Sequence, residues 1–546
     1  MRPPARPARA ASLVAIVGGS ASIGLAACLL PSYTLETTSG TGGAGTSTGG
    51  TGGTAGTSTS TDTTGGGGSG GTTSSMSTDT TGGGGAGGAT TSTTSTEPCT
   101  DCPDWAVSFG SQAEDTPVAI AASASNDIAV GGEHLGAFTV PPDKLVPFVG
   151  GSDGWLARLS PQGAGLSGLG LSGDSPAPDN QLVTDVAFAG EAVIVAGQFT
   201  GTLKLSPAVT LGAAGLGAQG FVARYSSGGA LEWSQTFGDT GNDGVSAVAV
   251  DAAGNVVVAG TYTGAANFFG KVLDQFGGGA NCFVLKLDAA GQVLPDASFT
   301  LRSWGSPDND VITDLAVGAD GGVFVLGNHT KALAFDEGSV PGVQNNSAAV
   351  DAYLVRLDPA GSYLIAKGFG GAGSQRAFGI AVDAGGAAYV AGIFDGTLSF
   401  GNTSLMDTIG GPDVFIARLD ASANATWAKQ ILNAGALEPV ALALAPDGGP
   451  ILAGGFLGTT DFLSGTMVTA ADLDPFVLRL DPGGNYVKHR VWSAPGSQRA
   501  NAIAVDGTGA LLMAGELAGP IDFGTGTLPV VGASDVFLLR HLLSAL

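Results

Sequence analysis

Basic residues, cysteines and long hydrophobic runs are all scarce in this chain of 546 residues. Only 21 residues are Lys or Arg, against 46 Asp or Glu, so the chain lacks the basic surface that nucleic-acid binding requires. Four cysteines are too few for a disulfide framework. No run beyond the N-terminus approaches the roughly 20 apolar residues of a membrane-spanning helix. Heptad and collagen-type repeats are also missing, which excludes coiled-coil and collagen-like folds.

Glycine and apolar residues are what the chain has in plenty. There are 93 glycines, and hydrophobic residues make up 43% of the chain, too many for a protein that is mostly disordered. Low complexity is confined to one segment, because residues 37–96 are almost wholly Gly, Thr, Ser and Ala. Such a segment cannot bury enough apolar area to offset its chain entropy. We therefore expect a disordered linker over 28–98 and a folded domain over 99–546.

The first 27 residues have the pattern of an export signal. Three arginines precede an uncharged stretch of small and apolar residues at 11–27, and Cys28 follows directly. A short apolar run behind a basic head is typical of a signal peptide. Leu25-Ala26-Ala27-Cys28 resembles the lipobox of bacterial lipoproteins, which implies lipidation of Cys28. Leu29 in place of Asp then implies the outer membrane or the cell surface. The alternative is an ordinary secretory signal with an incidental cysteine.

A second cysteine motif, Cys99-Thr-Asp-Cys102, ends the linker. A redox site would need a strand before the motif and a helix after it, but a Gly/Thr tract precedes it and Pro103 follows. A zinc site needs four ligands, and beyond this pair and Cys28 the chain offers Cys282 and four scattered histidines. In an oxidising envelope we expect a Cys99–Cys102 disulfide. Cys282 would then be a lone buried thiol.

From residue 103 onward the chain is a repeat array. A strand-like motif, aromatic-x-x-Arg/Lys, occurs seven times, and its basic residues are 61 to 70 positions apart. That period is too long for helical solenoids and suits one four-stranded propeller blade. The basic residues are Arg158, Arg224, Lys286, Arg356, Arg418, Arg479 and Arg540.

Other motifs recur in step and supply the remaining strands. Runs such as AVAVDAAGNVVVAG (247–260) and AIAVDGTGALLMAG (502–515) predict two buried strands around a tight Asp/Gly turn. A Leu-Asp-x-x-Gly turn then leads to a fourth strand. This fourth strand occurs six times after residue 110 and once before the first repeat, at 105–110. We therefore expect an all-β, seven-bladed β-propeller in which 105–110 completes the last blade, over 503–541, because an open array leaves unpaired edges.

These motifs resemble the bacterial seven-bladed β-propeller repeat family. Its pattern runs roughly IAVD-x-x-GN-x-YV-x-G and then D-x-F-x-x-K/R-L, and the best matches here are 242–291 and 374–420. The resemblance covers about 103–546, although Ser160 and Ser226 replace the Asp of the Leu-Asp-x-x-Gly turn in the first two copies. It implies a propeller fold and a cell-envelope location. The family carries no shared catalytic residues.

The loops that lead into the first strand of each repeat carry the candidate site. One polar residue from each would form a ring at one end of a propeller, able to hold a cation or a sugar. Each Asp could equally cap its own turn, whereas Arg is a poor cap and a good partner for carboxylates. Residues present in every copy, such as the aromatic of the strand motif, are expected to be structural. The ring consists of Asp115, Asp179, Asp243, Asp310, Arg376, Glu438 and Arg499.

No catalytic motif accompanies these residues. The chain has no G-x-S-x-G, no H-E-x-x-H, no phosphate loop and no calcium loop. The sequence therefore predicts no catalysis and no cofactor, and a role for Ca²⁺ has no motif behind it. We expect a monomeric envelope protein that is held to the membrane by its lipid alone and binds an envelope protein or a glycan. The alternatives are a carbohydrate-active hydrolase or lyase with carboxylates at the channel mouth, and a structural spacer.

Overall fold

The computed structural model describes residues 101–174, 179–294, 301–337, 343–344, 349–408, 411–437 and 441–544. Within these ranges every named element is a β-strand, which confirms the all-β prediction. No helix that could cross a bilayer occurs in the described part of the chain. The predicted signal peptide, linker, lipidation site at Cys28 and half-cystine at Cys99 lie outside the described residues, as does Glu438.

The repeating unit is a four-stranded antiparallel sheet. In one copy the order is β14 (Gly244–Val250), β15 (Val256–Tyr262), β18 (Asn281–Leu287) and β19 (Leu301–Gly305). The turn between β14 and β15 closes because Gly254 donates its backbone N–H to Asp251 O at 2.9 Å, with a φ of 83° that suits glycine. Every residue of β15 is buried, as its apolar run VVVAGTY requires.

The same order recurs in six further sets of strands. When all seven sets are counted along the chain, the fifth and sixth are joined into one sheet by pairing between β30 and β33. The sets are β2 (Asp115–Ala122), β3 (Ile128–His134), β6 (Asp153–Leu159), β7 (Gly165–Leu171); β8 (Gln181–Ala189), β9 (Ala192–Phe199), β12 (Gln219–Tyr225), β13 (Leu231–Phe237); β20 (Val311–Val317), β21 (Val323–His329), β23 (Asp351–Leu357), β24 (Tyr363–Phe369); β25 (Gln375–Val382), β26 (Ala388–Phe394), β29 (Asp413–Leu419), β30 (Ala425–Asn433); β32 (Ala441–Leu444), β33 (Pro450–Asp461), β34 (Met467–Leu480), β35 (Tyr486–Val491); and β36 (Gln498–Val505), β37 (Ala510–Leu517), β40 (Asp535–Leu542), β1 (Trp105–Phe109).

Short strands decorate these sheets, mostly as hairpins between the second and third strands of a set. The hairpins are β4 (Phe138–Val140) with β5 (Lys144–Val146), β10 (Thr202–Ser206) with β11 (Val209–Gly212), β16 (Asn267–Phe268) with β17 (Lys271–Val272), β27 (Thr397–Ser399) with β28 (Ser404–Met406), and β38 (Ile521–Asp522) with β39 (Thr527–Leu528), while β22 (Ala334–Phe335) pairs with β19 and β31 (Ala436–Leu437) pairs with β33.

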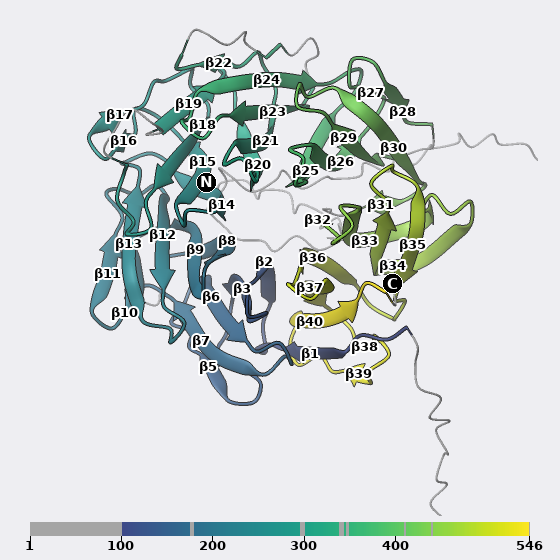
Figure 1. Cartoon of the computed structure of the whole chain (residues 1–546). Helices are drawn as coiled ribbons and strands as arrows, with labels where there is room; N and C mark the ends of the chain where they lie inside the picture. The colour runs from purple at the N-terminus through teal and green to yellow at the C-terminus, as the bar shows by residue number, and fades with distance from the viewer. Residues whose placement is uncertain are drawn as a thin grey trace, which may run out of the picture. The chain divides into compact units, whose positions relative to one another are not determined.

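The sheets stand around a common centre in the arrangement of a β-propeller (Figure 1). The first strand of each set contacts the first strands of its neighbours, and β2 contacts both β8 and β36. Between successive sheets lie separate apolar clusters, such as Val258 and Phe283 with Val222 and Phe237 from the preceding sheet. Of the strands in the described residues, the first, β1, pairs antiparallel with the last, β40, from Trp105 opposite Arg540 to Phe109 opposite Val536.

The repeated basic residue of each third strand is held by the turn between the first two strands. Lys286 Nζ lies 2.9 Å from Asp251 Oδ2, and Arg418 Nη2 lies 2.8 Å from Asp383 Oδ2. Arg224 is the exception and pairs instead with Glu232, because the turn in its sheet carries no Asp. The other pairs are Arg158–Asp127, Arg356–Asp320, Arg479–Asp447 and Arg540–Asp506.

Tryptophans on some outermost strands lock one sheet to the next. Trp427 donates its Nε1–H to Pro482 O at 3.0 Å, and its ring lies against Gly484, where an added Cβ would approach to 2.8 Å. Trp105 and Trp233 make the same contact with Pro161 O and Ala289 O. Since Gly484 also has a φ of 78°, this position needs glycine for two reasons.

We expect Gly484→Ala to lower the free energy of unfolding by about 2 kcal/mol, because alanine is strained at this φ and its Cβ displaces the indole of Trp427. Gly483→Ala in the same turn is the matched control, since a Cβ there would approach no atom closer than 3.2 Å. Denaturant melts of the two variants check this, and equal midpoints would contradict it.

Candidate functional site

Three predicted ring residues, Asp115, Asp243 and Asp310, occupy one equivalent place at the entry to the innermost strand. Each is at most 1% exposed. Asp310 accepts hydrogen bonds from the backbone N–H of Ser306 at 2.5 Å and from Ser306 Oγ at 2.9 Å. Burial raises the pKa of Asp115 and of Asp310 to about 7 and that of Asp243 to about 6. The geometry of these three carboxyls is that of buried caps on their own loops.

Glutamines that are absent from the predicted ring take the same place in three other sheets. Gln375 donates from Nε2 to Ala372 O at 3.1 Å and to Thr397 O at 3.0 Å. Gln181 and Gln498 likewise donate to loop carbonyls. The signal was present in the repeated Gly-Ser-Gln-Arg, where Gln stands one residue before Arg376 and Arg499.

The remaining predicted residues lie at other positions of the repeat. Asp179 accepts hydrogen bonds from the backbone N–H and Oγ1 of Thr202, both at 3.0 Å. Arg376 and Arg499 are the second residues of β25 and β36, and both are partly buried. The predicted residues that the structure describes therefore share one end of the innermost strands but occupy three different positions there.

Arg499 belongs to a polar cluster where the last sheet meets the first. Its Nη2 lies 3.2 Å from Glu516 Oε1, and Asn501 donates from Nδ2 to the same oxygen at 3.1 Å. Asn501 also donates to Pro117 O at 2.9 Å, which ties β36 to β2.

Glu133 adds a second carboxyl to this cluster. In the strand registers Glu133 stands opposite Thr116 and Glu516 opposite Arg499, so the two carboxyls occupy equivalent positions in adjacent sheets. Glu133 accepts a hydrogen bond from Ser152 Oγ at 2.8 Å. Burial raises the pKa of Glu133, and the negative charges of Glu516 and Glu114 raise it further. We call Arg499, Asn501, Glu516 and Glu133 the entry cluster.

Two further acids, Asp185 and Asp314, lie on the innermost strands β8 and β20. Asp185 accepts hydrogen bonds at 2.7 Å from its neighbour Val186 N–H and from Val248 N–H of β14. Asp314 does the same with Leu315 N–H at 2.7 Å and with Ile380 N–H of β25 at 2.8 Å. Burial raises both pKa values to about 7. Each carboxyl therefore bridges two neighbouring sheets.

Metal and thiol chemistry find little support in the described residues. No group of three or more His, Cys, Asp or Glu side chains there is placed to hold a metal ion. Cys282 is buried, and its Sγ lies 3.2 Å from Tyr353 Oη. Cys102 is disulfide-bonded, and the identity of its partner as Cys99 stays a prediction.

Comparisons with known proteins add little to this geometry. No family model and no curated protein matches the chain. Among solved structures, it is similar to a protein of unknown function from Dyadobacter fermentans, at 12% identity over 81% of this chain and 98% of that one, with a TM-score of 0.39. It is also similar to a mutant of the apocarotenoid oxygenase of Synechocystis, at 12% identity over 80% of this chain and 93% of that one, with a TM-score of 0.38. A third similar structure is the WD40 β-propeller domain of Doa1, at 11% identity over 68% of this chain and 96% of that one, with a TM-score of 0.28. At such scores none of these carries an argument about function.

Proposed function

We propose that this chain is a lipid-anchored, non-catalytic protein of the bacterial cell envelope, and that its entry cluster binds an envelope protein or a glycan. We further propose that it is a seven-bladed propeller of the bacterial repeat family, closed by β1. The observation that carries the binding proposal is the entry cluster itself. A residue that recurs in every sheet is explained by the fold, whereas Arg499, Asn501, Glu516 and Glu133 converge at one place.

The path of the chain supports this location for the binding surface. Along β40, Val536 stands opposite Glu516, whereas Arg540 stands opposite Trp105, where the described chain begins its first strand. Four residues of strand span about 13 Å, so the entry cluster lies at the far end of the sheet from the point where a membrane tether would join. A surface at this end of the sheet is therefore separate from the point of attachment and is available to a partner.

The charge of the protein limits the partner. The chain carries a net charge of −25, and the entry cluster holds two carboxyls and one guanidinium. Acidic polymers would be repelled, so a neutral glycan or a basic protein surface is the favoured ligand.

A thermal-melt screen of the purified protein against saccharides, divalent ions and envelope peptides tests the proposal. A ligand present at 100 times its Kd should add about 2.7 kcal/mol to the stability of the folded state. We expect the shift to disappear in the Arg376→Ala/Arg499→Ala double variant and to persist in Arg224→Ala, which removes an arginine from a third strand. A shift of the same size in the double variant would refute the entry cluster as the binding site. No shift with any ligand would favour the alternative that the protein is a structural spacer.

One observation favours a second candidate function, a glycan hydrolase. Glu516 is paired with Arg499, whereas burial raises the pKa of the nearby Glu133, and hydrolysis of glycosides uses two carboxyls that lie in different environments. Hydrolysis of a glycan that Glu133→Gln abolishes, while binding is retained, would establish this function in place of the first.

A further inference from the structure

Because the sheets repeat, a residue that differs from its equivalents in the other sheets can be recognised. One such residue lies in the turn between the first two strands of the first sheet. In the other six sheets this turn contains a glycine with positive φ. In the first sheet Asn126 takes that place, with a φ of 67°. Asn tolerates this region better than other side chains do, so the turn keeps its shape and gains a carboxamide. The glycines are Gly190, Gly254, Gly321, Gly386, Gly448 and Gly509.

A second exception lies in the turn between the third and fourth strands of the same sheet. The turn Ser160–Gly163 has Gln162 at its third position. Each of the other five turns of this kind has a small residue there, so Gln162 is the one long polar side chain in the series. The small residues are Gly228, Ala290, Ala360, Ser422 and Gly483.

Both exceptional residues line the same pocket, at the junction of the last and first sheets. The pocket has a volume of about 620 Å³, and Trp105, Pro161, Thr508 and Arg540 complete much of its wall. Asn126 Oδ1 is buried and accepts no hydrogen bond from any described residue. It lies over Gly507, where an added Cβ would come within 2.9 Å of it. An acceptor without a donor at the wall of a pocket is suited to a ligand that brings the donor.

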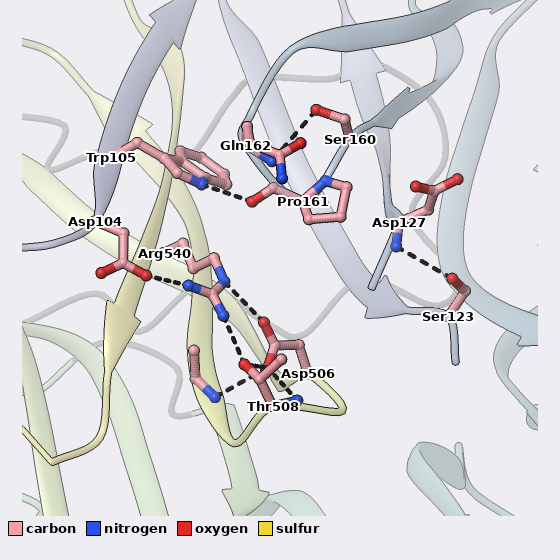
Figure 2. A network of polar contacts seen from close by, with 11 residues as sticks. Asp104, Trp105, Ser123, Asp127, Ser160, Pro161, Gln162, Asp506, Thr508 and Arg540 are labelled. Carbon is pink, nitrogen blue, oxygen red and sulfur yellow. Dashed lines mark hydrogen bonds and ion pairs between the residues drawn. The ribbon is translucent and has the colours of Figure 1, made fainter. Parts of the chain in front are cut away.

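The charge in this pocket is already balanced within the protein. Arg540 lies between carboxylates, with Nε 2.8 Å from Asp506 Oδ2 and Nη1 donating to Asp104 (Figure 2). Its Nη2 donates to Thr508 Oγ1 at 2.6 Å. Two carboxylates against one guanidinium leave no positive charge for an anion, and the net charge of −25 opposes anionic ligands further.

We propose that this junction pocket is a binding site for a neutral saccharide. A carboxamide both donates and accepts hydrogen bonds, as a sugar hydroxyl does, and Asn126 and Gln162 supply two of them. The indole edge of Trp105, whose Nε1 is held by Pro161 O at 2.9 Å (Figure 2), and the ring of Pro161 provide apolar surface for the C–H face of the sugar. The volume lies in the range of small-molecule sites. This pocket is at the opposite end of the sheets from the entry cluster, so the two sites are tested separately.

Calorimetric titration of the full-length protein with N-acetylglucosamine, its β1,4-linked dimer and maltose tests the proposal, with glucuronate as an anionic control. We expect at least one neutral sugar to bind and glucuronate not to bind. Asn126→Gly restores the residue of the other six turns and should weaken sugar binding at least tenfold without loss of thermal stability. Gln162→Ala should do the same.

The matched control is Gln292→Ala, which removes an exposed carboxamide beside the corresponding turn of the third sheet. Its affinity for the sugar should equal that of the unmodified protein. Binding that is unchanged in Asn126→Gly and Gln162→Ala, binding of glucuronate alone, or no binding of any of the three sugars would overturn the proposal. If Arg499→Ala abolished sugar binding while Asn126→Gly and Gln162→Ala still bound the sugar, the sugar would instead lie in the entry cluster.

Discussion

A chain that begins at Ser111 should lose at least about 4 kcal/mol of its free energy of unfolding, or fail to accumulate as soluble protein. Deletion of the preceding residues removes β1 and so exposes the edge of β40 from Val536 to Arg540, with which every residue of β1 pairs. It also removes Phe109, which is 5% exposed and packs against Phe138 and Trp155 at centroid distances of 5.6 and 6.1 Å. Loss of a buried phenylalanine alone costs about 3 kcal/mol or more.

The matched control for this deletion is a chain that begins at Asp101 and keeps β1. Its denaturant midpoint should equal that of the full chain. Phe109→Ala in the full chain is a milder version, expected to cost about 3 kcal/mol. If the chain from Ser111 unfolded at the same midpoint as the chain from Asp101, β1 would not be part of the folded sheet.

Stability should also fall as the pH rises through about 7, because of Asp185 and Asp314. Their folded pKa of about 7 exceeds the ordinary value of about 3.9. Between these two values the folded state holds protons that the unfolded state has released, so the contribution of each group to stability is lost as the pH rises. For one such carboxyl the loss between pH 5 and pH 8 is on the order of 2 kcal/mol.

The variant Asp314→Asn isolates this effect, because asparagine does not titrate. As the pH rises from 5 to 8, the free energy of unfolding of the variant should increase relative to that of the unmodified protein. This trend is expected whatever the difference in stability between the two proteins at pH 5. Asp420→Asn is the control, since backbone N–H groups of its own turn lower the pKa of Asp420 and it stays ionised over this range. Denaturant melts at several pH values measure both, and parallel curves for Asp314→Asn and the unmodified protein would contradict the assignment.

The strands could be predicted from the sequence because each motif carries its own physical reason. The run at 247–260 has the apolar residues of two buried strands around an Asp/Gly turn, and the structure has β14 and β15 there, with Asp251 and Gly254 closing the turn. The repeated aromatics, such as Phe283 and Tyr353, are fully buried, as expected of residues that recur in every sheet.

The candidate site was harder to predict because its position depends on how the innermost strands begin. The predicted ring consists of the most polar residue of each entry loop, and it therefore combines buried caps such as Asp310 with partly exposed residues such as Arg499. Asp185 and Asp314 were missed although both begin the same repeat motif. In each strand a β-bulge immediately precedes the Asp, and a bulge interrupts the alternation of strand faces on which a sequence argument depends.

Contacts between different sheets lay beyond the reach of the sequence. Asn501 reaches Pro117 O over 384 residues of chain, and Asn126 lines one pocket with Gln162 and Thr508 at the junction of the first and last sheets. Repeat alignment can show that Asn126 and Gln162 are exceptions. It cannot show that they share a pocket, because that depends on the last sheet standing beside the first.

Hydrogen exchange of the full-length protein tests the closed propeller most directly, by mass spectrometry of peptides that cover 105–109 and 536–540. If β1 completes the last sheet, the backbone amides of 105–109 that bond to β40 should exchange at least about a thousandfold more slowly than those of an unstructured chain. Their protection should match that of 536–540 and be lost together with it in denaturant. Exchange of 105–109 at the rate of unstructured chain, with 536–540 still protected, would contradict the account.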